Sequence, residues 1–145
     1  MPRSIAVPRG TRRPPLSLLL AAAVLSACST SSLANGGSPL TGDWGGAHAG
    51  LALTLTGGTI SYDCASGGLS APVVPDGSGD FAVPGVHVRG HGGPVRIGEV
   101  PDSVSARYVG RVSGDRMRLQ VFVGADVLGP YDLQLGAPPQ LVRCL

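Results

Sequence analysis

The stretch VSARYVGRVSGDRMRLQVFV, residues 104–123, alternates apolar and polar side chains on either side of a short polar break. In its second half, Met117, Leu119 and Val121 alternate with polar residues. This period of two gives the chain one apolar and one polar face, as in a half-buried antiparallel strand. Gly114-Asp115 supplies the turn, so the stretch predicts a hairpin between residues 104–113 and 116–124.

The two-residue turn determines which residues of this hairpin stand opposite each other. Val112 faces Met117 on the inner face, and Arg111 faces Arg118 on the outer face. Like charges in opposite positions cost up to about 1 kcal/mol, unless water and salt screen them. The outer face is therefore either a solvated surface or a candidate basic patch for an anionic partner, such as lipid headgroups or an acidic protein, made of Arg107, Arg111, Arg116 and Arg118.

The same alternation recurs on both sides of this hairpin. Residues 51–55, 60–64 and 131–135 have the period of two, and turns rich in glycine and proline separate the strands at short spacing. After residue 28, glycine or proline interrupts every stretch that could be helical. Many short strands indicate a barrel or a sandwich, and the short links favour the barrel. We expect an all-β, small antiparallel up-and-down β-barrel of about eight strands, at roughly residues 46–56, 59–65, 69–74, 79–84, 85–91, 104–113, 116–124 and 129–144.

The first 27 residues have the composition of a targeting segment rather than of a folded element. Four arginines and no acidic residue precede an apolar run over residues 16–25. This run is shorter than the ~20 apolar residues that cross a bilayer. A basic start, a short apolar core and small residues at the end are the parts of a secretory signal. We therefore assign residues 1–27 to a signal peptide.

The end of this segment, Leu25-Ser26-Ala27-Cys28, resembles the lipobox of bacterial lipoproteins. The resemblance implies that Cys28 carries a thioether-linked lipid, with palmitate among its acyl chains, and becomes the first residue of the mature chain. Two or three acyl chains make a stable membrane anchor. The expected location is the cell envelope, on a membrane and facing away from the cytoplasm. An ordinary signal peptide with a chance cysteine is the alternative, and the export route and the choice of inner or outer membrane stay open.

Residues 28–39 form a polar tether rich in serine and glycine, with one asparagine, a composition typical of a flexible linker. Residues 40–145 remain as one barrel domain with a single core. The formal charge of the chain is +2, but four of its eleven basic residues leave with the signal. Seven arginines then face nine acidic residues, which excludes the strong basic excess of a nucleic-acid-binding protein. We expect a monomer.

Two cysteines, Cys64 and Cys144, remain after lipidation. Cysteines outside the cytoplasm most often form disulfides, and the first and last strands of an up-and-down barrel meet, so we expect these two to be bonded. A reactive thiol is the alternative. It is less favoured because neither cysteine has a histidine or a lysine next to it, and no Cys-x-x-Cys pattern is present.

Two short motifs resemble those of known barrel families. Gly42-Asp43-Trp44 resembles the opening of lipocalins and avidins, whose tryptophan closes one barrel end. Residues 60–65, ISYDCA, and Val142-Arg143-Cys144 resemble the Tyr-x-Cys and the late cysteine of lipid-anchored inhibitors of c-type lysozyme. Ser105-Ala106-Arg107-Tyr108 partly matches the Ser-Gly-x-Arg-Tyr loop of those inhibitors, with alanine in place of the glycine and one spacer residue missing. The second resemblance implies inhibition of a hydrolase.

Residues 90–102 form the longest irregular link, and long links in small domains are often functional. His87 and His91 are four positions apart, too far on a strand for one metal ion without a further ligand. We therefore expect solvated histidines, on an outer face or a loop, and no metal site. If one end of the barrel binds a partner, the candidate rim residues are Trp44, His91, Arg96 and Glu99.

Catalysis has little support in the sequence, since most aspartates lie beside glycine, serine or proline, where they favour turns. We expect a membrane-anchored, non-catalytic binding module of the cell envelope, without a cofactor, whose partner is an envelope protein or a small ligand. Inhibition of a cell-wall hydrolase such as lysozyme is the alternative. A wide apolar cavity would favour a small ligand, whereas a filled barrel with a projecting loop would favour a protein partner.

Overall fold

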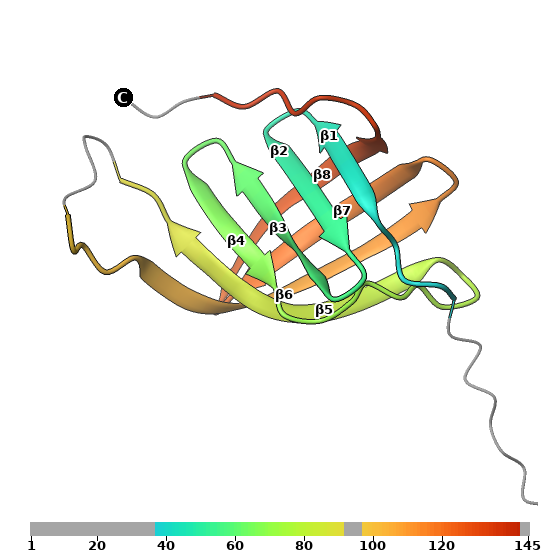
Figure 1. Cartoon of the computed structure of the whole chain (residues 1–145), viewed down its shortest axis with the longest axis horizontal. Coiled ribbons are helices and arrows are strands. Elements are labelled where there is room, and N and C mark those ends of the chain that lie inside the picture. The colour runs from blue at the N-terminus through green and yellow to red at the C-terminus, as the bar shows by residue number, and fades with distance from the viewer. Residues whose placement is uncertain (1–36, 92–96, 143–145) are drawn as a thin grey trace, which may run out of the picture. The chain divides into compact units, whose positions relative to one another are not determined.

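The computed structural model of the chain describes residues 37–91 and 97–142, and every regular element in these ranges is a strand. Each strand pairs antiparallel with the next one along the chain, and the first also pairs with the last, so the sheet closes into a barrel (Figure 1). The predicted antiparallel up-and-down barrel is therefore confirmed. Its strands are β1 (Gly42–Gly46), β2 (Ala49–Thr54), β3 (Gly57–Tyr62), β4 (Ala65–Leu69), β5 (Asp80–Arg89), β6 (Asp102–Ser113), β7 (Arg116–Val123) and β8 (Asp126–Leu135).

Alternation along each strand decides which side chains fill the barrel. In β7, Met117, Leu119, Val121 and Val123 are buried, while the residues between them are exposed. Inward side chains from all eight strands meet in one hydrophobic core. Burial of apolar surface, worth roughly 25 cal/mol per Å², is the main contribution that stabilises such a core.

Large rings in the interior lie against glycines on other strands. A Cβ atom at Gly110 would lie 2.6 Å from Cζ of Phe81, and one at Gly67 would lie 2.1 Å from the hydroxyl of Tyr108. Both distances are too short for a real contact, so only glycine fits at these positions. Large and small residues thus alternate across the interior, and the barrel is filled by its own side chains.

The number of strands agrees with the expectation, but two errors in the expected boundaries cancel. The expected strand 46–56 corresponds to β2, and β1 before it was not expected; a tight turn in which His48 has a φ of 66° joins the two. The strand expected at 69–74 lies earlier in the chain, as β4, which ends at Leu69. The expected strands 79–84 and 85–91 are one strand, β5, which continues through Pro84. The Pro84 carbonyl accepts a hydrogen bond from the Ser70 N–H at 2.9 Å, so the proline nitrogen faces the loop after β4, where no strand needs its missing N–H.

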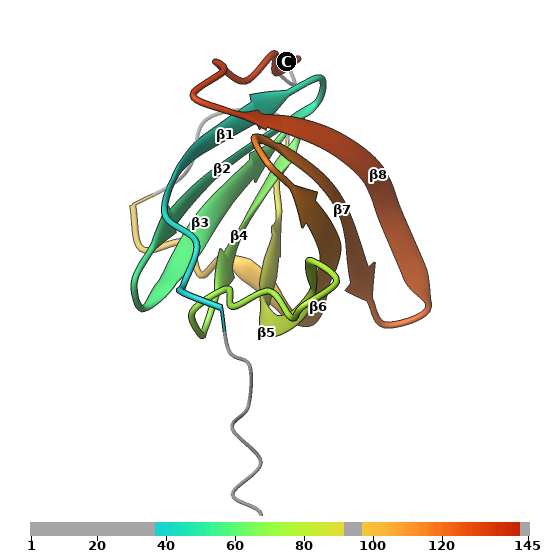
Figure 2. The ribbon, with the colours of Figure 1, turned by 90° about the vertical axis from the view of Figure 1, so that its right-hand side faces the viewer.

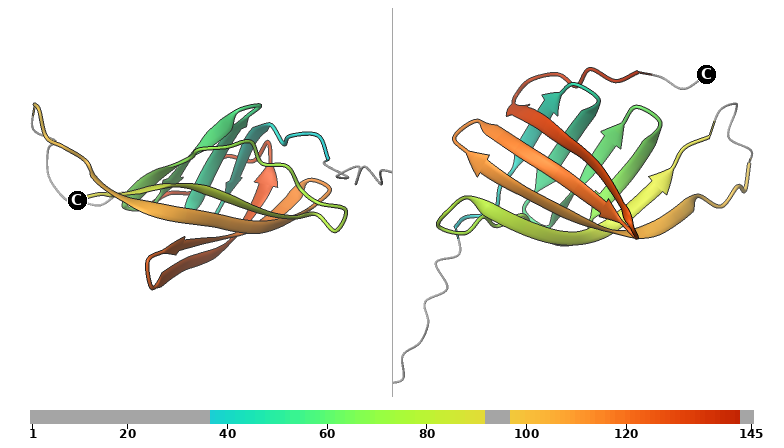
Figure 3. Two further views of the ribbon diagram at one scale, coloured as in Figure 1. Left: turned by 90° about the horizontal axis from the view of Figure 1, so that it is seen from below. Right: turned by 180° about the vertical axis from the view of Figure 1, so that it is seen from behind.

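The expected strand 129–144 is β8 followed by an extended segment, residues 136–142, which we call the C-terminal strap. The strap turns back along the outer face of β1 (Figure 3), where the Gln140 N–H donates to the Gly46 carbonyl at 2.9 Å. A Cβ atom at Gly50, on β2, would lie 2.6 Å from Cβ of Pro139. Glycine at this outward position therefore lets the strap lie directly on the sheet.

The antiparallel order sorts the links between strands to two ends of the barrel. The polar end, so called for its interior side chains, carries the β1–β2, β3–β4, β5–β6 and β7–β8 links. The apolar end carries residues 37–41 and the remaining links (Figure 2). There the Leu40 N–H donates to the Val73 carbonyl at 2.8 Å, which ties the chain before β1 to the β4–β5 loop.

Several of the sequence-based assignments lie outside the described residues: the signal peptide 1–27, Cys28 with most of the tether, Arg96 and Cys144. Cys64 is the one cysteine in the described part of the chain, so its pairing with Cys144 stays a prediction. Within residues 37–91 and 97–142, no helix is long and apolar enough to cross a membrane.

Candidate functional site

The residues expected at a binding rim lie in two separate places. Trp44 is only 3% exposed and belongs to the core, where it stands between Leu51 and Leu135 on the neighbouring strands. His91 and Glu99 form an ion pair on the β5–β6 link, which extends beyond the barrel (Figure 1). A cavity of about 310 Å³ beside this link is lined by the link and its flanking strands, without Trp44.

The outer face of β6 and β7 carries arginines in the predicted register. Arg111 stands opposite Arg118 and Val112 opposite Met117, as the two-residue turn predicted. Each arginine of this pair also has an acidic neighbour from another strand, and Nε of Arg118 lies 4.0 Å from Oδ1 of Asp132 on β8. These carboxylates offset the repulsion between Arg111 and Arg118. The sequence predicts the repulsion but not the carboxylates, because they lie far from the two arginines along the chain.

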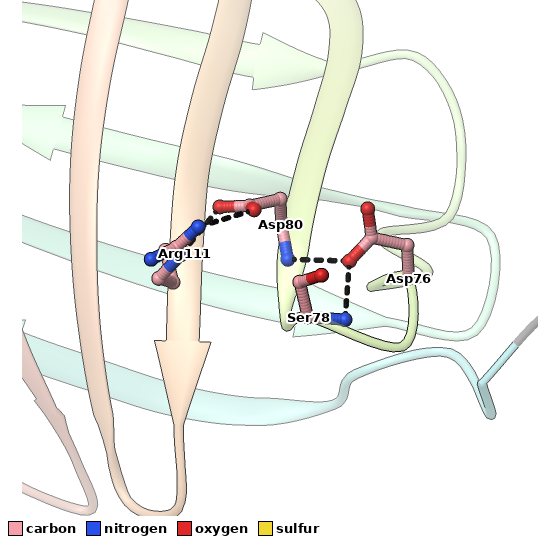
Figure 4. A network of polar contacts seen from close by, with 4 residues as sticks. All are labelled: Asp76, Ser78, Asp80 and Arg111. Atoms are coloured by element: carbon pink, nitrogen blue, oxygen red, sulfur yellow. Dashed lines mark hydrogen bonds and ion pairs between the residues drawn. The ribbon is translucent and has the colours of Figure 1, made fainter.

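The acidic neighbour of Arg111 is Asp80, at the start of β5 (Figure 4). Nε of Arg111 donates to Oδ1 of Asp80 at 2.7 Å, and Nη2 donates to Oδ2 at 2.6 Å. Asp76 orients this carboxylate by accepting the N–H groups of Ser78 and Asp80, at 2.8 and 3.0 Å (Figure 4). The guanidinium lowers the pKa of Asp80, and the carboxylate raises the pKa of Arg111. This bidentate contact fixes the orientation of both groups.

A groove of about 730 Å³ lies next to these residues, on the outside of the barrel between β7–β8 and the C-terminal strap. We call it the arginine groove. Arg116 lines this groove and forms no ion pair with any described residue. Arg107, the fourth arginine of the predicted patch, stands opposite Phe122 on the same outer face but does not line the groove. Three arginines and one aspartate give the groove a positive charge; its polar lining is Arg111, Ser113, Arg116, Arg118, Asp132 and Gln134.

The structure corrects the expectation for His87, which lies inside the barrel. Its side chain is only 6% exposed, because β5 keeps its alternation through Pro84 and places His87 on the same face as Phe81 and Val83. Burial lowers the pKa of His87, and the nearby Arg89 lowers it further, so the imidazole is neutral at pH 7. Counting in twos from Phe81 places His87 on the inner face. This count was not available from the sequence, because residues 79–84 and 85–91 were expected to be separate strands.

His87 is one of several rings that line a cup of about 250 Å³ at the polar end, which we call the polar cup. Tyr62 lies between two other rings, with its centroid 5.6 Å from that of His87 and 5.5 Å from that of Tyr131. Leu128 adds an apolar wall, and His48 and Asp63 lie at the edge. Tyr62 is the tyrosine of the Tyr-x-Cys motif, and the alternation of Ile60 with Ser61 already places it on the inner face, whereas Tyr131 was not expected at a site.

Two polar atoms of this lining, Oη of Tyr62 and Nδ1 of His87, are buried without a hydrogen-bond partner among the described residues. The Tyr108 hydroxyl lies near that of Tyr62 and donates to the Val86 carbonyl at 2.7 Å, but the two hydroxyls do not form a hydrogen bond with each other in this geometry. Burial, together with the nearby Tyr108 hydroxyl, raises the pKa of Tyr62 and keeps the phenol protonated. An unpaired buried polar group costs about 1–3 kcal/mol, so these two atoms need an explanation.

Asp63, at the edge of the polar cup, holds two parts of the chain together. Its Oδ2 atom lies 2.6 Å from Nδ1 of His48, and its Oδ1 atom accepts the N–H of Val142 at 2.8 Å. The bond from Val142 and the contact with His48 lower the pKa of Asp63. The β1–β2 turn, the β3–β4 turn and the end of the strap therefore meet at this carboxylate.

The described residues offer recognition by charge in the arginine groove and by rings and hydrogen bonds in the polar cup. Within the described ranges, no three histidine, cysteine, aspartate or glutamate side chains gather into a group that could hold a metal ion. Comparison of the chain with known protein families, curated proteins and solved structures finds no match.

Proposed function

We propose that the chain is a lipid-anchored, non-catalytic binding module of the bacterial cell envelope, which holds an acidic surface of an envelope protein in its arginine groove. The observation that carries this proposal is a positive groove of about 730 Å³ on the outside of a barrel whose interior is filled by core side chains. A core filled in this way leaves the outer surface as the place where a protein partner can bind. The groove is positive although the mature chain has an excess of acidic residues, which favours an anionic partner.

The charges around the groove favour a protein partner over a lipid surface. Asp132 lies in the groove and Asp80 lies beside it, each close to an arginine. A sheet of anionic headgroups would be repelled by these carboxylates, whereas a protein can place an acidic group against Arg116 and a hydrogen-bond donor against Asp132. Such mixed patterns give specificity in protein interfaces.

The test of the groove is co-purification from solubilised membranes, with the partner identified and its retention measured over a salt series. Replacing both Arg116 and Arg118 by serine is expected to reduce retention and to weaken its dependence on salt. Arg89→Ser, which removes an arginine from the β5–β6 link, is the control and is expected to retain the partner. Unchanged retention in the groove variant would contradict the proposal, and salt-dependent binding to anionic liposomes alone would replace the protein partner by lipid.

The anchor is proposed from the resemblance of residues 25–28 to a lipobox. Cys28→Ala removes the thiol to which the lipid would be attached. We expect this variant to incorporate no labelled fatty acid and to remain largely unprocessed. Incorporation at the level of the unmodified chain would exclude Cys28 as the anchor.

We also propose the disulfide between Cys64 and Cys144. The N–H of Val142 bonds to Asp63, the residue before Cys64, so the strap reaches this part of the barrel two residues before the second cysteine. Titration of free thiols in the denatured, unreduced protein is expected to find none at these two positions. Two reactive thiols would exclude the bond.

Inhibition of a cell-wall hydrolase remains the second candidate, because the β5–β6 link extends beyond the barrel and exposes Ile97 and Val100 (Figure 1). The stretch Ser105-Ala106-Arg107-Tyr108, which partly matches the inhibitory loop of lysozyme inhibitors, lies within β6, and its tyrosine is fully buried. Inhibition would therefore depend on the link. An assay of c-type lysozyme with the full chain and with Ile97→Ser and Val100→Ser variants decides this candidate.

A further inference from the structure

Two neighbouring side chains of the polar cup are both deeply buried and keep an unpaired polar atom. Tyr62 and His87 line it and are more than nine-tenths buried, at 7% and 6% exposure. Oη of Tyr62 and Nδ1 of His87 lack a hydrogen-bond partner in the described part of the chain. Tyr108, an inward tyrosine that does not line the cup, donates its hydroxyl to Val86.

A phenylalanine at position 62 or 87 would fill the same space without an unpaired polar atom. Native proteins rarely keep such atoms without a reason, and a ligand is one of the usual reasons. One other buried polar atom in the described ranges, Nε1 of Trp44, is also unpaired and does not belong to the cup. The coincidence that matters is therefore two unpaired polar atoms on adjacent rings, both lining one cavity.

We propose that the polar cup binds a small uncharged ring compound that carries a hydroxyl or an amide group. A cavity of about 250 Å³ exceeds the ~150 Å³ that holds benzene, so one ring with a polar substituent fits. The rings of Tyr62 and Tyr131 and the side chain of Leu128 supply the surface on which such a ring packs.

The choice of polar group follows from the two unpaired atoms. The Tyr62 hydroxyl both donates and accepts, and Nδ1 of a neutral imidazole does one or the other, according to its tautomer. A hydroxyl or a primary amide also donates and accepts, so it can satisfy both atoms after a small rotation of the rings. A hydrocarbon of the same size leaves them unpaired.

The absence of net charge follows from the electrostatics of the lining. Burial keeps both Tyr62 and His87 neutral, and the Asp63 carboxylate is already engaged by His48 and the N–H of Val142. A charged ligand would lose its water without finding a free opposite charge among these groups. The cup therefore selects uncharged ligands, at the end of the barrel opposite to residues 37–41.

The experiment uses the full chain purified in detergent and three compounds of similar size: phenol, toluene and benzoate. NMR shifts of the Tyr62 and His87 side chains report binding, with an expected dissociation constant for phenol on the order of 1 mM. We expect toluene to bind roughly tenfold more weakly, because one net hydrogen bond is worth about a factor of ten. Benzoate is also expected to bind more weakly than phenol, because its charge loses water without meeting a free opposite charge.

Tyr62→Phe is expected to lower the affinity for phenol about tenfold and to leave the affinity for toluene unchanged. Trp44→Phe also removes an unpaired buried polar atom, but outside the cup, and this control is expected to bind phenol like the original chain. The melting temperature of each variant shows that it is folded. The proposal is overturned by any of three results: no shift with phenol, equal affinities for phenol and toluene, or an unchanged affinity for phenol in Tyr62→Phe.

Discussion

The two ends of the barrel interior are built by the same alternation but from different chemistry. At the apolar end, Leu53, Leu69 and Phe81 point inward, and Phe81 lies against Gly110. At the polar end, Tyr62 and His87 occupy equivalent inward positions and keep unpaired polar atoms. Alternation thus determines which side chains point inward, but the residue types at those positions determine the chemistry of each end. The apolar end contributes mainly to stability, whereas the polar end keeps unpaired polar atoms that cost stability and that the proposed ligand would pair.

The largest effect in this comparison is expected from Phe81→Ala. The substitution removes a buried ring and leaves a cavity above Gly110, which costs about 3–5 kcal/mol of unfolding free energy. Chemical denaturation followed by circular dichroism measures this loss. Tyr62→Phe is the matched substitution at the polar end, and it is expected to leave the unfolding free energy unchanged or to raise it by about 1 kcal/mol, since it removes an unpaired hydroxyl.

An equal loss of unfolding free energy in both variants would contradict this difference between the two ends. It would mean that the Tyr62 hydroxyl has a partner in solution and that the polar end stabilises the barrel as much as the apolar end does. A loss of less than 1 kcal/mol in Phe81→Ala would mean that the core closes around the missing ring.

Periodicity was sufficient to predict one part of the fold in detail. Residues 104–123 gave the β6–β7 hairpin, its turn at Gly114-Asp115 and the opposition of Arg111 and Arg118. A two-residue turn leaves a single register, so local sequence is enough there. Closure of the barrel followed from the short links and the number of strands.

The sequence was less informative where a residue's role depends on distant strands. Residues 79–84 and 85–91 were expected to be two strands, and nothing local shows that β4 ends before the nitrogen of Pro84 would need a partner. The continuous strand places His87 inside the barrel, where it was not expected. Likewise, Asp80 lies 31 positions from Arg111, so their bidentate contact cannot be predicted from a local sequence pattern. The candidate patch was thus located by sequence, while its ion pairs and the polar cup required the three-dimensional arrangement.

The second prediction concerns the covalent link proposed near the polar end. Cys64→Ser is expected to lower the unfolding free energy by about 2–4 kcal/mol, because a disulfide to Cys144 would close a long loop and restrict the unfolded chain. Denaturation with and without a reducing agent measures the effect. The reduced original chain is expected to match the variant, and a variant as stable as the oxidised chain would show that the bond does not stabilise the barrel.

The third prediction uses the buried imidazole of the polar end. The pKa of His87 is lowered in the folded chain, so between pH 7 and 5 the unfolded chain takes up the proton first. Stability is therefore expected to fall as the pH drops below about 6.5, by no more than about 1.4 kcal/mol per pH unit for one site. Arg89 strengthens this trend and Asp102 opposes it. His87→Phe is expected to flatten the profile in this range, and an unchanged slope would place the titrating group elsewhere.

The smallest effect is expected at Asp63, where the polar end meets the C-terminal strap. Its lowered pKa means that the carboxylate favours the folded state above about pH 4 and loses this contribution as the pH falls through the lower folded value. Asp63→Asn imitates the loss at pH 7, because an amide oxygen is a weaker acceptor for the Val142 N–H than a carboxylate. Hydrogen exchange is expected to become faster at the Val142 amide. It is expected to remain slow at Gln140, whose N–H bonds to the Gly46 carbonyl independently of Asp63. Faster exchange at both amides would mean that the strap depends on this one carboxylate, and unchanged exchange at Val142 would mean that the strap is held at the polar end by other contacts.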